Sequence, residues 1–258
     1  MSERLKDEVA VITGAGGDIG RAFAFSFAEH GAKILLPDIN IELAESTAKD
    51  IRDKGGEAVA VKTDISDQVD TKLMAEKVIT QYGKVDILIN NAAIYKGLEY
   101  KPWDTLTVKE WDRVFEVNVR GTWLCCKAIA PFMQQRSKGK IINISSGIIS
   151  CPPFSADHLA HYACSKAAVY TLTQVLARAL GKWSIHVNAI APGFVATEAS
   201  LKMPGVPEDA FERSAANACI NHIQEAEDLV GTAVFLASKE SDYLTGQLIA
   251  VNGGGWLR

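Results

Sequence analysis

Short β-branched segments alternate with longer helical segments along the whole chain, and this alternation constrains the fold more than any other feature. The expected strands are Val9–Thr13, Lys33–Leu36, Ala58–Lys62, Ile87–Asn90, Lys140–Ile144, Ile185–Asn188 and Gln247–Val251. Apolar residues recur at helical spacing in Ile19–His30, Glu42–Lys54, Lys72–Tyr82, Val108–Gln135, Tyr162–Gly181 and Ala226–Ala237. Nearly continuous apolar strands separated by helices predict a parallel sheet that is covered on both faces.

The predicted fold is therefore an α/β Rossmann fold, a doubly wound seven-stranded parallel sheet with helices on both faces. No linker, repeat or low-complexity stretch divides the chain, so residues 1–258 are expected to form one domain. The least regular part, at about 196–222, contains Pro204, Gly205 and Pro207 and follows a strand end. Because loops at the carboxyl ends of parallel strands bind ligands, this segment is a candidate substrate lid; the alternative is an ordinary surface excursion.

Composition narrows the class of protein. The formal net charge of -4 offers no general field for nucleic acid or anionic lipid, so a small-molecule partner is expected. The first residues lack the apolar centre of a signal peptide, and no run is long enough to span a membrane, which predicts a cytoplasmic protein. The cysteines form no CxxC pair, which argues against a disulfide framework or a zinc site. Cys125 and Cys126 are expected to fill a helix interior.

The first strand runs directly into a glycine-rich turn, Thr13–Gly20, that opens a helix. Glycine permits the tight turn and lets the backbone approach a pyrophosphate, while the helix N-terminus supplies N–H groups. Asp38 ends the second strand, where a carboxylate can hydrogen-bond the adenosine ribose and repel a 2′-phosphate. Asp18 adds negative charge, and the residues that flank Asp38 include no arginine. The pattern predicts NAD(H) as the cofactor in preference to NADP(H).

Two further strand ends carry polar residues. Asp64 follows the third strand and could accept the adenine amino group, and Asn90–Ala93 ends the fourth. Each alone is more often a cap or turn residue. Their expected place on the edge that carries the glycines makes them candidates for the same site.

Tyr162 and Lys166 stand four residues apart at the start of a predicted helix, hence on one face. A nearby cation favours phenolate, which would bring the pKa of the tyrosine from about 10 toward working pH and permit general acid–base catalysis. Taken alone, the spacing is common and usually means a solvated helix face.

Several motifs together resemble the classical short-chain dehydrogenase/reductase family, in order and over essentially the whole chain. They are Thr13–Gly20, Asn90–Ala93, Asn118, Ser146, Tyr162-x-x-x-Lys166 and Asn188-Ala-Ile-Ala-Pro-Gly193. The resemblance implies that hydride passes directly between nicotinamide and substrate, without a metal. It implies that Tyr162 is the acid/base, that Lys166 lowers its pKa and holds the nicotinamide ribose, and that Ser146 binds the substrate oxygen. Asn118 would support a water chain from Lys166, and Ser145 would be structural.

The same resemblance implies a set of cofactor contacts. They are Gly14, Gly16, Asp18, Ile19, Gly20, Asp38, Asp64, Ile65, Asn91, Ala92, Tyr162, Lys166, Pro192, Gly193, Val195 and Thr197, with Ile190 also expected beside the nicotinamide. Two positions depart from the family pattern, because Ala93 and Asn252 stand where glycine and aspartate are usual.

The expected substrate is a secondary alcohol or its ketone, or a sugar or polyol. Candidate substrate contacts are Ser146, Phe154, His158, Phe194 and Met203, and Phe211 and Trp256 could add apolar surface. These aromatics slightly favour a compact alcohol with an apolar or ring portion. Asp157, His158 and His161 invite comparison with a metal site, but no fourth ligand is evident and no metal is predicted.

Two alternative functions stay open. One is a 3-oxoacyl-thioester reductase of the same family; such enzymes usually prefer NADPH, so Asp38 counts against it. The other is a non-catalytic NAD-sensing protein, against which the intact Ser146, Tyr162 and Lys166 argue. The family is typically homotetrameric, and the expected helices Val108–Gln135 and Tyr162–Gly181 resemble the pair that packs between subunits.

Overall fold

The computed structural model, which describes residues 3–149 and 157–256, contains one seven-stranded sheet in the order β3-β2-β1-β4-β5-β6-β7. Its strands are β1 (Val9–Ile12), β2 (Lys33–Asp38), β3 (Glu57–Lys62), β4 (Ile87–Asn90), β5 (Gly139–Ile144), β6 (Ile185–Pro192) and β7 (Leu248–Val251). All of the strand pairs are parallel. The strand order reverses between β1 and β4, and such a switch point opens a crevice beyond the strand ends.

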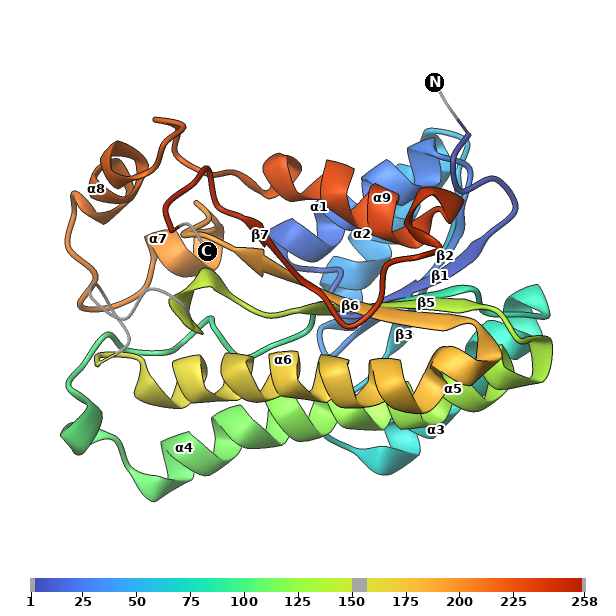
Figure 1. Ribbon diagram of the computed structural model, residues 1–258, viewed down its shortest axis with the longest axis horizontal. Coiled ribbons are helices and arrows are strands. Elements are labelled where there is room, and N and C mark those ends of the chain that lie inside the picture. Colours follow the sequence, from blue (N-terminus) through green and yellow to red (C-terminus); the bar gives the residue numbers. More distant parts are fainter. Residues whose placement is uncertain (1–2, 150–156, 257–258) are drawn as a thin grey trace.

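Helices cover both faces of this sheet (Figure 1). One face carries α1 (Asp18–Glu29), α2 (Ile41–Asp53) and α9 (Val230–Ala237), and the other carries α3 (Gln68–Tyr82), α4 (Val108–Phe115), α5 (Thr122–Arg136) and α6 (Ala160–Leu180). Alternate strand residues enter the two cores: Ile12 of β1 packs with Phe23 and Phe27 of α1, whereas Val11 packs with Met74 of α3. The doubly wound fold predicted from the sequence is confirmed.

Most expected elements are present, with shifted ends. The third helix starts earlier than predicted because the Asp67 side chain accepts hydrogen bonds from the backbone N–H groups of Val69 and Asp70. The sixth strand continues beyond Asn188 to Pro192. The last predicted helix begins as a 3₁₀ turn, Ala226–Leu229.

The predicted single helix Val108–Gln135 is wrong in one respect. A π-helical turn, Glu116–Gly121, joins α4 to α5, and Asn118 lies within it. Such a turn adds a residue to the helical repeat and re-aims the side chains, and it occurs frequently at functional sites. A change confined to one turn leaves the apolar periodicity nearly intact, so the sequence pattern did not reveal it. Cys125 and Cys126 are buried in α5, as expected.

The irregular segment 196–222 lies beyond the carboxyl end of β6 (Figure 1). It contains two short helices that the sequence pattern did not predict, α7 (Glu198–Leu201) and α8 (Ala210–Asn217). The Asp18 carboxylate accepts a hydrogen bond of 2.6 Å from the backbone N–H of Glu198, which ties this segment to the glycine turn. Within the described part of the chain, no helix combines the length and the apolar character needed to cross a membrane.

Candidate active site

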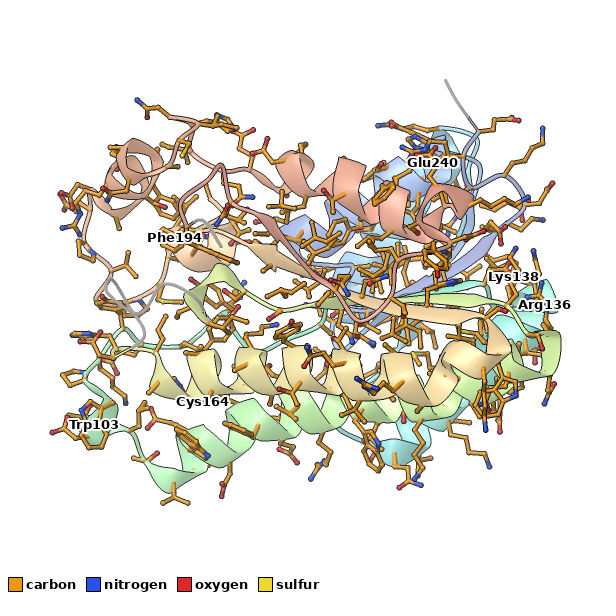
Figure 2. All side chains as sticks on the ribbon, in the orientation of Figure 1. Trp103, Arg136, Lys138, Cys164, Phe194 and Glu240 are labelled. Atoms are coloured by element: carbon orange, nitrogen blue, oxygen red, sulfur yellow. The ribbon has the colours of Figure 1, made fainter. Side chains whose placement is uncertain are left out.

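A cavity of about 900 Å³ lies where the glycine turn, the carboxyl ends of the strands and segment 196–222 meet. It is lined by all sixteen cofactor contacts that the family resemblance implies, from Gly14 through Thr197, and by Ser146, Phe194, Met203, Phe211 and Trp256. Ile190 is an exception among the expected nicotinamide neighbours, because it is fully buried in the core behind the cavity. Figure 2 shows Phe194 at the end of the molecule that carries α7 and α8, and Arg136 and Lys138 at the opposite end.

The glycine turn has the geometry of a close-approach site. Gly14 has a φ of +69°, and a Cβ atom there would lie 2.8 Å from the Cα of Ala92. A Cβ at Gly16 would lie 2.7 Å from the Cβ of Leu43. The N-terminus of α1 has no side-chain cap, so its first N–H groups are directed at the turn without a side-chain acceptor. This arrangement fits a pyrophosphate.

The Asp38 carboxylate lies against this turn. Its Oδ2 accepts a hydrogen bond of 2.9 Å from the Gly16 N–H, and its Oδ1 accepts one of 2.8 Å from the Asn40 N–H. The described residues that line the cavity beside it, Pro37, Ile39, Asn40 and Leu43, include no basic side chain. The carboxylate is thus fixed in direction, with remaining lone pairs for hydroxyl donors.

Asn91 and Asp64 are also engaged with the protein. The Asn91 amide donates to the carbonyl groups of Thr13 and Gly14 at 3.0 and 3.1 Å, so it holds the turn in place. Asp64 accepts hydrogen bonds from the N–H and hydroxyl of Ser66 at 2.9 and 2.6 Å. Burial alone would raise the pKa of Asp64, but these bonds and the nearby arginine charges lower it overall.

Tyr162 and Lys166 lie one turn apart near the start of α6. The Lys166 Nζ is 5.5 Å from the centroid of the Tyr162 ring and donates a hydrogen bond of 2.8 Å to the Ile144 carbonyl. Burial lowers the pKa of Lys166 to about 8. Burial and the neighbouring Tyr95 raise the pKa of Tyr162, and a hydrogen bond with Ser146 opposes them. The pKa shift of Tyr162 is therefore opposite to the expected one, because the loss of hydration is its largest cause.

The adjacent serines after β5 have different contacts. The Ser145 hydroxyl is buried and donates a hydrogen bond of 2.9 Å to the Lys166 carbonyl, so it joins β5 to α6. Ser146 and Tyr162 both line the cavity, and Ser146 lowers the pKa of Tyr162 against the effect of burial. The geometry therefore places Ser146 beside the phenol and gives Ser145 a structural contact.

The Asn118 side chain bridges two segments behind the cavity. Its Oδ1 accepts a hydrogen bond of 2.7 Å from the Ile94 N–H, and its Nδ2 donates one of 3.0 Å to the Ser165 hydroxyl. Ser165 in turn donates to the Tyr162 carbonyl at 2.7 Å. Asn118 thus fixes the segment after β4 relative to the helix that carries Tyr162.

Among the residues of the cavity wall that sequence reasoning missed, Tyr95 and Gln224 make the most specific contacts. Tyr95 contacts the Tyr162 ring edge-on, with the ring centroids 5.0 Å apart. The Gln224 Oε1 accepts from the Gly193 N–H at 2.9 Å, and its Nε2 donates to the Val251 carbonyl at 2.6 Å. The position of Tyr95 just after Asn90–Ala93 was a usable signal. Gln224 had none, because its partners are backbone groups distant in sequence.

Two of the expected substrate contacts are not among the described residues that line the cavity. Phe154 lies outside the described residues, and His158 does not line the cavity but stacks on the ring of Tyr100, with centroids 4.4 Å apart. His161 is buried, and burial lowers its pKa. Over residues 3–149 and 157–256, no three His, Cys, Asp or Glu side chains are grouped so as to hold a metal ion.

Comparisons with known proteins agree with this architecture. The profile of the family described as enoyl-(acyl carrier protein) reductase matches residues 14–255. Galactitol 2-dehydrogenase of Agrobacterium fabrum is 38% identical, covering 98% of this chain and 99% of that protein. The 3-oxoacyl-(acyl-carrier-protein) reductase of Thermotoga maritima is 35% identical, covering 97% and 98%. A solved 7α-hydroxysteroid dehydrogenase, complexed with NADH and 7-oxo glycochenodeoxycholic acid, matches with a TM-score of 0.91 at 32% identity, covering 100% and 97%.

Proposed function

Because the chain belongs to the classical short-chain dehydrogenase/reductase family, we propose that it is an NAD(H)-dependent enzyme that interconverts a secondary alcohol and a ketone. One observation carries the proposal: in a cavity whose other end is the glycine turn, Ser146 and Tyr162 both line the wall and Tyr162 lies one helical turn from Lys166. In this proposal residues 1–258 form one catalytic domain, with the segment at about 196–222 as the substrate lid.

The residues have separate tasks in the proposed reaction. Ser146 hydrogen-bonds the substrate oxygen, and the Tyr162 hydroxyl exchanges a proton with it. A bound nicotinamide supplies or accepts the hydride. Because burial raises the pKa of Tyr162, the phenol is protonated at neutral pH and is ready to donate its proton to a ketone. Lys166 keeps a positive charge beside the ring up to about pH 8 and is positioned to hold the nicotinamide ribose.

Asp38 supports NAD(H) as the cofactor. Its carboxylate is held against the glycine turn, where it would accept hydrogen bonds from ribose hydroxyls and repel a 2′-phosphate. The related 7α-hydroxysteroid dehydrogenase was solved with NADH, which agrees with this choice. The cytoplasmic location expected from the sequence stays a prediction.

Replacing Tyr162 with Phe tests the proposed chemistry. The variant keeps the ring but loses the proton, so turnover should fall at least about 100-fold while NADH still binds. Purified protein would be assayed with NAD and a panel of secondary alcohols, polyols and hydroxy acids at the NADH absorbance band. Tyr170→Phe removes a phenol on the same helix outside the cavity and serves as the control. Near-normal turnover by Tyr162→Phe would rule out Tyr162 as the proton donor.

The Thermotoga maritima relative supports a second candidate, reduction of a 3-oxoacyl thioester. This candidate predicts activity on a 3-oxoacyl thioester. It also predicts a kcat/KM with NADPH that is at least as high as the kcat/KM with NADH. Asp38 argues against it, because a carboxylate beside the ribose disfavours NADPH. A steady-state assay with both cofactors separates the two functions.

We also propose that the expected homotetramer uses the outer surface of α4, α5 and α6. Trp111 and Trp123 are 38% and 43% exposed there, and together with Phe115 and Leu172 they line a surface hollow. Aromatic surface of this kind is typical of subunit contacts. Trp123→Glu should therefore shift the protein to smaller species in size-exclusion chromatography with light scattering. A native protein that is monomeric at micromolar concentration would contradict the proposal.

A further inference from the structure

We propose that Tyr95 recognises a second oxygen on the carbon next to the reacting carbon. The substrate is then an α-hydroxy ketone or vicinal diketone, or in the reverse direction a vicinal diol. This inference rests on the proposed alcohol–ketone function and names the substrate class of that same site.

Tyr95 places a second phenol beside the proposed proton donor. The Tyr95 and Tyr162 rings meet edge-to-face, with centroids 5.0 Å apart and planes at 61°, and both residues line the cavity. Both phenols therefore border the part of the cavity where the proposed reaction binds its substrate. Tyr95 also raises the pKa of Tyr162, in addition to the larger effect of burial.

The relative position of the two rings is fixed by buried hydrogen bonds. Asn118 accepts from the N–H of Ile94, the residue before Tyr95, and donates to Ser165, whose hydroxyl bonds the Tyr162 carbonyl. The backbones that carry the two phenols are therefore held to one amide. Preorganisation of this kind suits recognition of two oxygens at a set separation.

Tyr95 also belongs to an apolar cluster beside the cavity. It packs against a cluster whose members are Leu98, Val114, Leu159, Met203, Ile94, Tyr100, Ile148, Tyr162 and Val206. Tyr95 lines the cavity beside Tyr162. A ligand oxygen in the cavity can therefore accept a hydrogen bond from the Tyr95 hydroxyl. Burial raises the pKa of Tyr95, so this hydroxyl keeps its proton and can donate.

The proposed contact requires no additional chemistry. The hydride and the Tyr162 proton add to the carbonyl carbon and oxygen, while the second oxygen keeps its bonds and is only hydrogen-bonded by Tyr95. Tyr95 therefore determines specificity and is not itself reacting.

A matched pair of ketones tests the inference, with NADH as the cofactor: 2-hydroxycyclohexanone and cyclohexanone, which share a ring and differ in the vicinal oxygen. The native protein should reduce the hydroxyketone with a kcat/KM about tenfold higher, the effect of one well-placed hydrogen bond. In Tyr95→Phe, which keeps the ring contact, the ratio should fall to near one while NADH affinity is unchanged. Tyr170→Phe should retain the ratio of the native protein.

The outcomes separate the two proposals. A native ratio near one, which needs no variant, overturns the role of Tyr95 and leaves the alcohol–ketone function standing. A ratio retained by a folded Tyr95→Phe variant does the same. Absence of turnover of both ketones, and of every alcohol in the panel, overturns the proposed function and this inference with it.

Discussion

At the scale of single residues, direction of hydrogen bonding decides function more than residue type. Asp38 is one of many aspartates, yet its carboxylate is aimed at the glycine turn by the N–H groups of Gly16 and Asn40. We expect Asp38→Ser combined with Ile39→Arg to raise kcat/KM for NADPH relative to NADH at least about 100-fold, because a repelling charge is replaced by a phosphate-binding one. Steady-state kinetics with both cofactors measure this ratio, and Glu42→Ser is a control for loss of an exposed carboxylate nearby. An unchanged ratio would show that Asp38 does not select the cofactor.

At the scale of elements, Gln224 connects three parts of the chain. It lies just after segment 196–222, and it hydrogen-bonds the loop that follows β6 and the end of β7. Gln224 bonds the Gly193 N–H and the Val251 carbonyl, while its backbone carbonyl accepts from the Ala196 N–H at 2.8 Å. Gln224→Ala should loosen the loop expected to bind nicotinamide and raise the Kd for NADH about tenfold, the effect of losing one or two hydrogen bonds. Fluorescence titration with NADH measures it. The control is Gln247→Ala, which removes an exposed glutamine side chain directly before β7 and should leave the Kd for NADH unchanged. Equal effects of the two variants would contradict the role of Gln224.

At the scale of the whole molecule, a buried carboxylate joins elements at the end opposite the cavity. Asp86 accepts hydrogen bonds from the Val9 N–H and Arg136 and pairs with Lys84 at 2.8 Å. Burial would raise its pKa, but these partners lower it overall. The ionised Asp86 carboxylate therefore stabilises the folded protein fully above its unfolded pKa of about 3.9. This stabilisation is lost as the pH falls through the lower pKa that Asp86 has in the folded protein. Asp86→Asn should cost about 2–3 kcal/mol in urea unfolding at pH 7 and flatten the acid dependence. Asp242 is an exposed carboxylate that pairs with Lys140, and Asp242→Asn serves as the control. This variant should lower the free energy of unfolding by less than about 1 kcal/mol. Equal losses in the two variants would contradict the stabilising role of Asp86.

Much of the fold could be predicted from local sequence. The alternation of apolar strands and helices determined the doubly wound parallel sheet, because each element must bury an apolar face and only a two-sided parallel sheet buries them all. The glycine turn, Asp38 and the Tyr162–Lys166 spacing were readable for the same reason, since each depends on neighbours in the chain or on a strand end.

Contacts between distant segments were decided only by the tertiary structure. Asn118 lies in a π-helical turn, and Ser145, unlike Ser146, hydrogen-bonds the Lys166 carbonyl. Burial raises the pKa of Tyr162, whereas the sequence had predicted a lower pKa. The tertiary structure also brought Tyr95 against Tyr162 and Gln224 against Gly193. Burial and hydrogen-bond direction arise only when segments far apart in the chain pack together, so periodicity and spacing carry no record of them.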